Sequence, residues 1–188
     1  MSISSIHSVS PVYVTEIKQD EELLSANFQK AFEELDVDLI IELLNQGANP
    51  DQPIKLTKKL IQSFNRNLVE KSYDREASKE GIENLLKSFD ELDNQEVSEE
   101  VLKFVNRAKL IAKDLEEGLN VPDQVFKDFQ VEILDSQIPS DAELKELKSV
   151  SLVPLEVAVQ LNFISLVEKL IQSGAEYVDP SLNQEEAS

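Results

Sequence analysis

Apolar residues recur three and four positions apart along most of the chain, which is the spacing of amphipathic helices. The first such stripe runs from Gln19 to Leu35. A second, short helix follows, for which Asp38 is the expected N-cap and Gly47 the expected left-handed C-cap. The pattern therefore predicts a helical hairpin over residues 27–51, followed by a polar loop with two prolines.

Further helices are expected in the middle of the chain, where the apolar pattern is less regular. Their expected positions are residues 56–69, 82–89, 98–118, 121–129 and 142–148. Ser98 is the predicted N-cap of the longest of them, and Ser140 and Glu143 have the spacing of a capping box. Residues 1–18 are rich in Ser and β-branched residues and are expected to form a loose arm.

The first hairpin pattern returns near the end of the chain. Residues 153–175 read VPLEVAVQLNFISLVEKLIQSGA, again a short helix, a tight turn and a second short helix that stops at glycine. When the two segments are aligned on Gly47 and Gly174, Leu155 matches Phe28 and Ala158 matches Ala31. We therefore predict two equivalent hairpins, and we expect Phe28, Phe32 and Phe163 to lie in their core.

These two segments resemble ankyrin repeats, whose pattern opens with Thr-Pro-Leu-His-x-Ala. Residues 153–158 read VPLEVA, and Gly-Ala ends the second helix in both segments. The resemblance implies an all-α fold in which helical hairpins stack on one another, because one hairpin alone cannot bury its apolar face. It also implies that protein partners bind the hairpin loops and the concave helix face, which here are the residues Asn49, Asp51, Gln52, Glu156 and Gln160.

The clear repeats cover only residues 27–51 and 153–179. Gly47 and Gly174 are 127 residues apart, which is not a multiple of the 33-residue ankyrin period. Either degenerate repeats with insertions fill the middle, or a separate helical insert covers residues 54–150; we favour the first interpretation. We expect a single domain over residues 19–179 and an acidic tail over 180–188.

Composition excludes several chemistries. The chain of 188 residues has no cysteine, one histidine (His7) and four glycines, so disulfides, thiolate nucleophiles, His-based triads and glycine-rich phosphate loops are not expected. The formal charge of −19 disfavours binding to nucleic acid. No apolar run is long enough to span a membrane, and the N-terminus has no signal-peptide pattern, so we expect a cytoplasmic, reducing location.

Carboxylates are the only abundant reactive groups, so an enzyme would need a pair of them or a carboxylate metal site. The candidate clusters are Asp36 with Asp38, and Asp90 with Glu91 and Asp93. They fit caps and solvated turns better, so we expect no catalytic residue, no cofactor and no metal. An enzyme assembled from distant carboxylates stays open as the minor alternative.

The charge is uneven along the chain. Residues 55–79 contain seven basic and three acidic residues, a local charge of +4. Lys55, Lys59 and Arg66 recur near helical spacing. They form either a solvated face paired with the protein's own acidic residues or a contact for an acidic partner or for the acidic face of a second copy.

The leading hypothesis is a non-enzymatic protein-interaction module, plausibly a bacterial effector that binds a host protein after translocation, because the C-terminal EEAS is weakly similar to translocation signals. The alternative is an immunity or antitoxin-type inhibitor whose acidic surface masks a basic protein.

Overall fold

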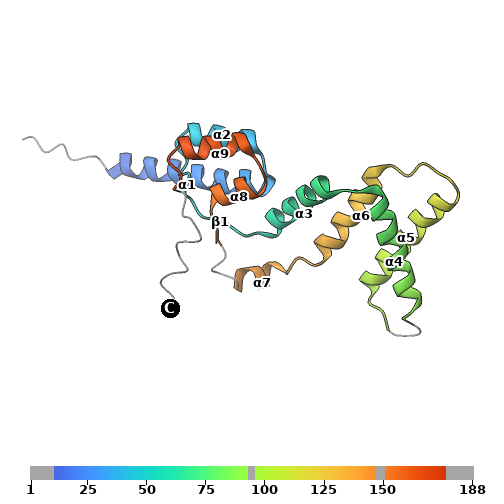
Figure 1. Ribbon diagram of the computed structural model, residues 1–188. Coiled ribbons are helices and arrows are strands. Elements are labelled where there is room, and N and C mark those ends of the chain that lie inside the picture. The colour runs from blue at the N-terminus through green and yellow to red at the C-terminus, as the bar shows by residue number, and fades with distance from the viewer. Residues whose placement is uncertain (1–10, 93–95, 147–150, 177–188) are drawn as a thin grey trace, which may run out of the picture. The chain divides into compact units, whose positions relative to one another are not determined.

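The computed structural model describes residues 11–92, 96–146 and 151–176 (Figure 1). Within them the chain is mostly helical, with one two-stranded sheet of two residues per strand, which confirms the all-α prediction. In order along the chain the elements are α1 (Pro11–Glu34), α2 (Val37–Asn45), β1 (Ile54–Lys55), α3 (Lys58–Ser72), α4 (Arg75–Asp90), α5 (Glu99–Glu116), α6 (Asp123–Ser136), α7 (Asp141–Glu146), β2 (Ser151–Leu152), α8 (Pro154–Gln160) and α9 (Ile164–Gln172). No helix in the described ranges is long and apolar enough to cross a membrane.

The chain divides into two compact units. The first, here called the hairpin unit, comprises Met1–Leu60 and Ser140–Ser188, and the second, the middle unit, comprises Ile61–Pro139. The helices between the two repeats thus form a unit of their own. Degenerate repeats with insertions and a separate helical insert both stay open as interpretations of this unit.

The hairpin unit contains two helical hairpins with the same local structure, α1–α2 and α8–α9. Leu35 and Asn162, at equivalent positions between the two helices, both have a positive φ, of 51° and 58°. Gly47 and Gly174 follow the second helices with φ of 97° and 94°, which is the left-handed C-cap that the sequence predicts. The backbone hydrogen bonds also repeat: Ala48 N donates to Leu43 O, and Ala175 N donates to Leu170 O, both at 2.9 Å.

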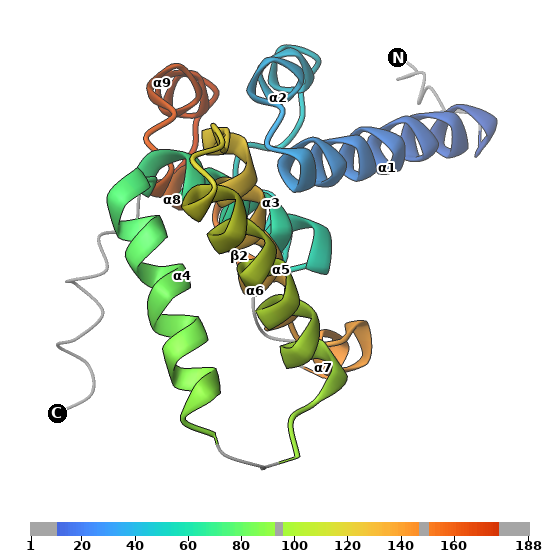
Figure 2. The ribbon, with the colours of Figure 1, turned by 90° about the vertical axis from the view of Figure 1, so that its right-hand side faces the viewer.

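The two hairpins pack side by side, with α2 against α9 (Figure 2). Phe28 and Phe32 are fully buried as predicted, and their rings meet edge to face with centroids 5.1 Å apart. Ala31 and Ala158 are also fully buried at equivalent positions, where a small side chain lets the paired helices approach. Phe163 is only half-buried, since it is the N-cap residue of α9.

Two features of the first hairpin differ from the prediction. The N-cap of α2 is Asp36 and not Asp38: Asp36 Oδ1 accepts a hydrogen bond from Leu39 N at 3.1 Å. The helix α1 begins at Pro11, so residues 11–18 of the expected arm belong to it. The remainder of the arm, with His7, and the acidic tail over 180–188 lie outside the described residues.

A short antiparallel sheet, which the sequence did not predict, joins the two hairpins. In it, Ile54 pairs with Leu152 and Lys55 pairs with Ser151. Gln29 of α1 holds the edge of β1, because its amide Nε2 donates to Lys55 O at 3.1 Å and its Oε1 accepts from Lys55 N at 2.8 Å. This contact fixes the position of residues 52–55 beside α1.

The middle unit has its own hydrophobic core, formed by the buried side chains of Ile82, Ala108, Ile111, Val121, Phe126 and Phe129. Within this unit α4 packs against both α5 and α6. Ser98 caps α5 by accepting a hydrogen bond from Val101 N, as predicted. The predicted capping box of α7, in the hairpin unit, is also present: Ser140 N donates to Glu143 Oε2 at 2.8 Å. The carboxylate's two bonds with Ser140 lower the pKa of Glu143.

Candidate functional site

The predicted contact residues of the first loop form hydrogen bonds within the hairpin unit. Asn49 Oδ1 accepts from Asp51 N at 3.0 Å, which shapes the turn after Gly47. Asp51 Oδ1 accepts from Glu176 N at 2.9 Å and so ties the loop of the first hairpin to the end of the second. Gln52 Nε2 donates to Ser25 O of α1 at 3.0 Å. These side chains therefore hold the loop in place, and a partner would meet a preformed surface.

A groove of about 990 Å³ lies along α1 in the hairpin unit. Both Gln52 and Lys55 line it, together with Pro53 and with side chains of α1: Glu21, Glu22, Ser25, Ala26, Gln29, Lys30 and Glu33. Most of the lining residues have polar side chains, including three carboxylates and two ammonium groups, but apolar atoms make up more of the lining surface than polar atoms do. Such a mixed surface suits a peptide or protein segment with charged side chains better than a wholly apolar small molecule, whose pockets are lined mainly by apolar side chains.

The two residues predicted on the second hairpin do not belong to this groove. Glu156 and Gln160 are exposed on α8, but the groove is lined only by α1 and residues 52–55. The resemblance placed the contact residues on the hairpin loops and on the concave helix face, and of those residues only Gln52 lines the groove. Residues Glu21, Glu22, Ser25 and Glu33 are thus groove residues that sequence reasoning missed, since only the position of the loop beside α1 reveals them.

The three predicted basic residues do not share a helix face. Lys55 lies in β1, whereas Lys59 and Arg66 lie in α3. Lys59 Nζ is 2.6 Å from Glu34 Oε1, and this contact lowers the pKa of Glu34. Arg66 forms no ion pair with any residue that the structure describes and lines a pocket of the middle unit.

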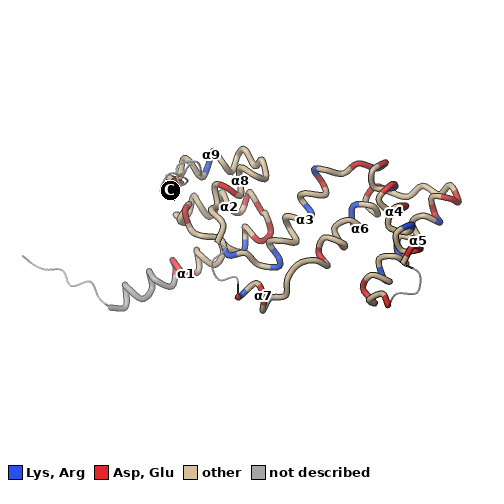
Figure 3. Tube along the Cα trace, turned by 60° about the horizontal axis from the view of Figure 1, so that its bottom comes forward, with Lys and Arg blue, Asp and Glu red and all other residues tan. Residues whose placement is uncertain are grey.

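Other charges of the basic stretch also have partners inside the protein. Arg75 pairs with Asp123, and Lys79 Nζ is 2.8 Å from Glu76 Oε1. Figure 3 shows that the helices of both units carry acidic positions and that basic positions are interspersed among these along the chain. At least three of the seven basic residues in the stretch thus have carboxylate partners within the chain, which favours the interpretation of an internally paired face.

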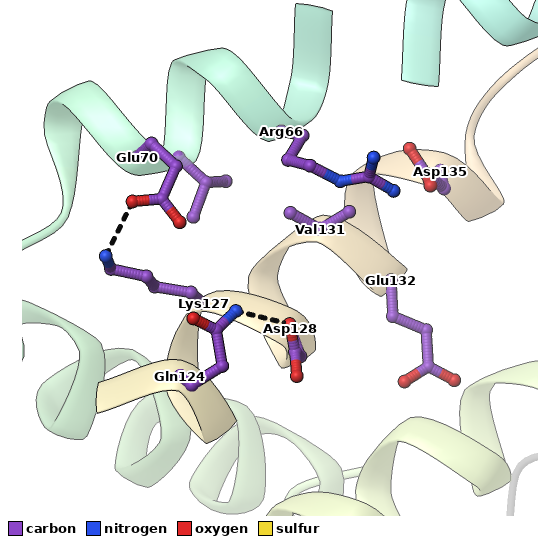
Figure 4. A pocket seen from close by; sticks show the side chains of 9 residues that line it. Arg66, Glu70, Gln124, Lys127, Asp128, Val131, Glu132 and Asp135 are labelled. Atoms are coloured by element: carbon purple, nitrogen blue, oxygen red, sulfur yellow. Dashed lines mark hydrogen bonds and ion pairs between the residues drawn. The ribbon is translucent and has the colours of Figure 1, made fainter. Parts of the chain in front are cut away.

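A second, smaller pocket of about 280 Å³ lies in the middle unit between α3 and α6 (Figure 4). Four carboxylates line it: Glu70, Asp128, Glu132 and Asp135. Each has a partner within the protein. Glu70 pairs with Lys127, and Glu132 pairs with Lys103 and Arg107. Asp128 accepts a hydrogen bond from Gln124, and Asp135 accepts one from Asn65. Figure 4 shows Glu70 and Lys127 joined across the pocket mouth and Arg66 extending towards Asp135.

The charged partners of this pocket argue against acid catalysis by Glu132. A glycosidase-type pair needs one carboxyl group that keeps its proton near neutral pH. Lys103, whose Nζ is 2.8 Å from Glu132 Oε1, and Arg107 instead lower the pKa of Glu132, so its carboxylate is ionised. The pairing fastens α5 to α6 within the middle unit.

A further polar cluster joins the start of α4 to the start of α6. Asp123 Oδ1 accepts hydrogen bonds from Arg75 and from Tyr73 Oη, the latter at 2.9 Å. The pKa of Asp123 is lowered, mainly by Arg75 and to a smaller extent by Tyr73. The pKa of Tyr73 is raised, first by desolvation and second by its hydrogen bond with Asp123. Arg75 also lies over the ring of Phe126 at 5.1 Å, which anchors this cluster on the core.

Among the described residues, no group of three or more His, Cys, Asp or Glu side chains is arranged to hold a metal ion. Asp36, from one predicted carboxylate cluster, is the helix cap described above, and Asp93, from the other, lies outside the described residues. Comparison with protein-family models, curated proteins and solved structures gave no match. The assignment of function therefore rests on the surfaces of the two units.

Proposed function

We propose that this chain is a non-enzymatic protein-interaction module and that the groove along α1 receives a polar segment of its partner. The observation that carries the proposal is the groove itself, a space of about 990 Å³ lined by a helix face and by the turn that contains Gln52 and Lys55. The internal bonds of Gln29 and Gln52 hold that turn before any partner arrives. Preorganisation of this kind lowers the entropic cost of binding.

The resemblance to ankyrin repeats supports the same function. In that family a repeat consists of a β-turn and two helices with a period of about 33 residues. The 127 residues between Gly47 and Gly174 exceed one such period by about 94, and 95 residues lie between the paired Lys55 and Ser151. We interpret the hairpin unit as two adjacent repeats, with residues 56–150 inserted at the turn that joins them.

Charge indicates the kind of partner. The chain carries 37 acidic and 18 basic residues, and Lys59, Arg75 and Lys79 are engaged by its own carboxylates. At the groove, Glu21 and Glu22 stand side by side on the exposed surface of α1. A partner with a basic surface would be steered towards such a field, and its association would weaken as salt screens the charges.

The test is capture of the partner by charge-reversed variants. Glu21→Arg/Glu22→Arg changes the groove, and Glu80→Arg/Glu83→Arg makes the same change of charge on exposed residues of α4 in the middle unit. We expect the groove variant to lose at least about tenfold in affinity for the captured protein and the α4 variant to lose much less. Equal losses would show that only the net charge matters and would overturn the assignment of the groove.

The same capture distinguishes the two biological settings that the sequence leaves open. An effector is expected to take its partner from a host lysate, whereas an immunity-type inhibitor is expected to take a basic protein from the lysate of its own source. The acidic surface favours a basic partner in both settings, so the identity of the captured protein decides between them.

A further inference from the structure

The second hairpin has exposed apolar side chains at three positions whose equivalents in the first hairpin are buried or half-buried. Phe32 is fully buried, but its equivalent Val159 is 53% exposed. Leu44 is 6% exposed, but its equivalent Ile171 is 57% exposed. Ile164, the equivalent of the half-buried Val37, is 64% exposed. We call Val159, Ile164 and Ile171 the open face.

The neighbouring hairpin explains this difference. The two hairpins have the same turn geometry and the same backbone hydrogen bonds, so their own folding cannot cause it. The first hairpin has the second as its neighbour, because α2 packs against α9. Within the described part of the hairpin unit, Ile164 and Ile171 of α9 have no such cover, as their exposure shows. A helix of similar apolar character would therefore fit there.

The opposite side of the first hairpin has the reverse pattern. Pro154 and Val157 of α8 are buried, but their equivalents on α1 are the exposed Asn27 and Lys30. This end is polar and does not complement the open face. Head-to-tail stacking of copies of this chain, which would join the two ends, is therefore disfavoured.

The acidic residues around the open face indicate the charge of a partner that could bind there. Glu168 lies between Ile164 and Ile171 on the exposed side of α9, and Glu156 lies one turn before Val159 on α8. Two copies joined symmetrically through this face would bring these carboxylates together in a chain of charge −19. Residues 177–188 contain three acidic and no basic residues, so this segment has the wrong charge as well.

We propose that the open face binds an amphipathic helix of another protein, whose apolar stripe is bordered by Lys or Arg. The apolar side chains would cover Ile164 and Ile171 as α9 covers α2, and the flanking cations would meet Glu156 and Glu168. This surface is separate from the groove along α1, so the two can be tested independently.

The experiment uses the full chain and a labelled synthetic helix of about 18 residues, with Leu at positions i, i+3, i+4 and i+7 and Lys on the flanks. Fluorescence anisotropy measures its binding to the wild-type protein and to two variants that keep the net charge. Ile164→Ser/Ile171→Ser removes the open face, and Leu110→Ser/Leu119→Ser removes two comparably exposed apolar side chains of the middle unit. We expect the first variant to bind at least about tenfold more weakly and the second to bind as the wild type does.

A companion peptide with Glu in place of Lys tests the charge argument. We expect it to bind the wild-type protein at least about tenfold more weakly, and we expect Glu156→Lys/Glu168→Lys to reverse the order of the two peptides. Equal binding of the Lys peptide to the wild type and to Ile164→Ser/Ile171→Ser would overturn the proposal. It would also fail if sedimentation showed a dimer of the wild-type protein that this variant dissociates, because the occupant would then be a second copy. Both failures leave the groove assignment untouched.

Discussion

Equivalent positions of the two hairpins provide a direct test of the packing. Leu44 of α2 and Ile171 of α9 occupy the same place in the repeat, but the first is 6% exposed and the second 57% exposed. Removing a buried leucine side chain costs about 2–5 kcal/mol, so we expect Leu44→Ala to destabilise the hairpin unit by about 3 kcal/mol. Ile171→Ala should cost about 1 kcal/mol or less, because more than half of its side chain already contacts solvent.

Native-state hydrogen exchange measures this difference locally, which matters because a chain with two units need not unfold in a single step. A loss of about 3 kcal/mol corresponds to roughly a hundredfold faster exchange of the most protected amides of α2 and α9. The amides of α4 and α5 serve as an internal reference, since these helices belong to the other unit. Equal acceleration by the two substitutions would refute the reasoning from equivalent positions, as would acceleration by Leu44→Ala that is the same in α4 and α5.

Two further predictions concern the glycines and one ion-pair network. Gly174→Ala should destabilise the chain by about 1 kcal/mol because its φ of 94° strains an L-residue, whereas Gly81→Ala, at an open position inside α4, should stabilise it by about 0.5–1 kcal/mol; denaturant midpoints followed by circular dichroism measure both. Glu132→Gln should cost about 1 kcal/mol near pH 7 through the lost pairs with Lys103 and Arg107. Because the native state lowers the pKa of Glu132, this stabilisation is present above the unfolded-state pKa of about 4.3 and is lost as pH falls through the native pKa. The free energies of unfolding of the wild type and of Glu132→Gln, measured by urea titration across that pH range, should therefore converge at low pH. A difference that stays constant with pH would contradict the assigned ion pairs of Glu132.

The sequence predicted the helices well where one local signal marks each boundary. Gly47 and Gly174 terminate α2 and α9, and Ser98 caps α5, because left-handed glycines and capping hydroxyls act over a few residues. The prediction of Asp38 as the N-cap of α2 was wrong. Asp36 and Asp38 are only two residues apart, and only the turn at Leu35 shows that Asp36 faces the free amides of α2.

Long-range arrangement could not be predicted in the same way. The strands β1 and β2 have two residues each, too short for an alternating pattern to appear, and 95 residues lie between the paired Lys55 and Ser151. The groove depends on that pairing and on the bonds of Gln29 with the backbone of Lys55. Gln52 was predicted from the resemblance and Lys55 from the local excess of basic residues, but the α1 side chains that line the groove with them were not predicted.

The open face shows what the hydrophobic pattern by itself leaves undetermined. Ile164 and Ile171 have the same apolar character as Val37 and Leu44, so apolar character alone does not distinguish the exposed pair from the other two. Whether such a side chain is buried depends on a neighbour that the local sequence does not encode. The polar side of the first hairpin does carry a local signal, because Asn27 and Lys30 stand where the second hairpin has Pro154 and Val157. Comparing the repeats position by position therefore identifies the end that is closed by its own polar residues, and it leaves α8–α9 as the end at which stacking can continue.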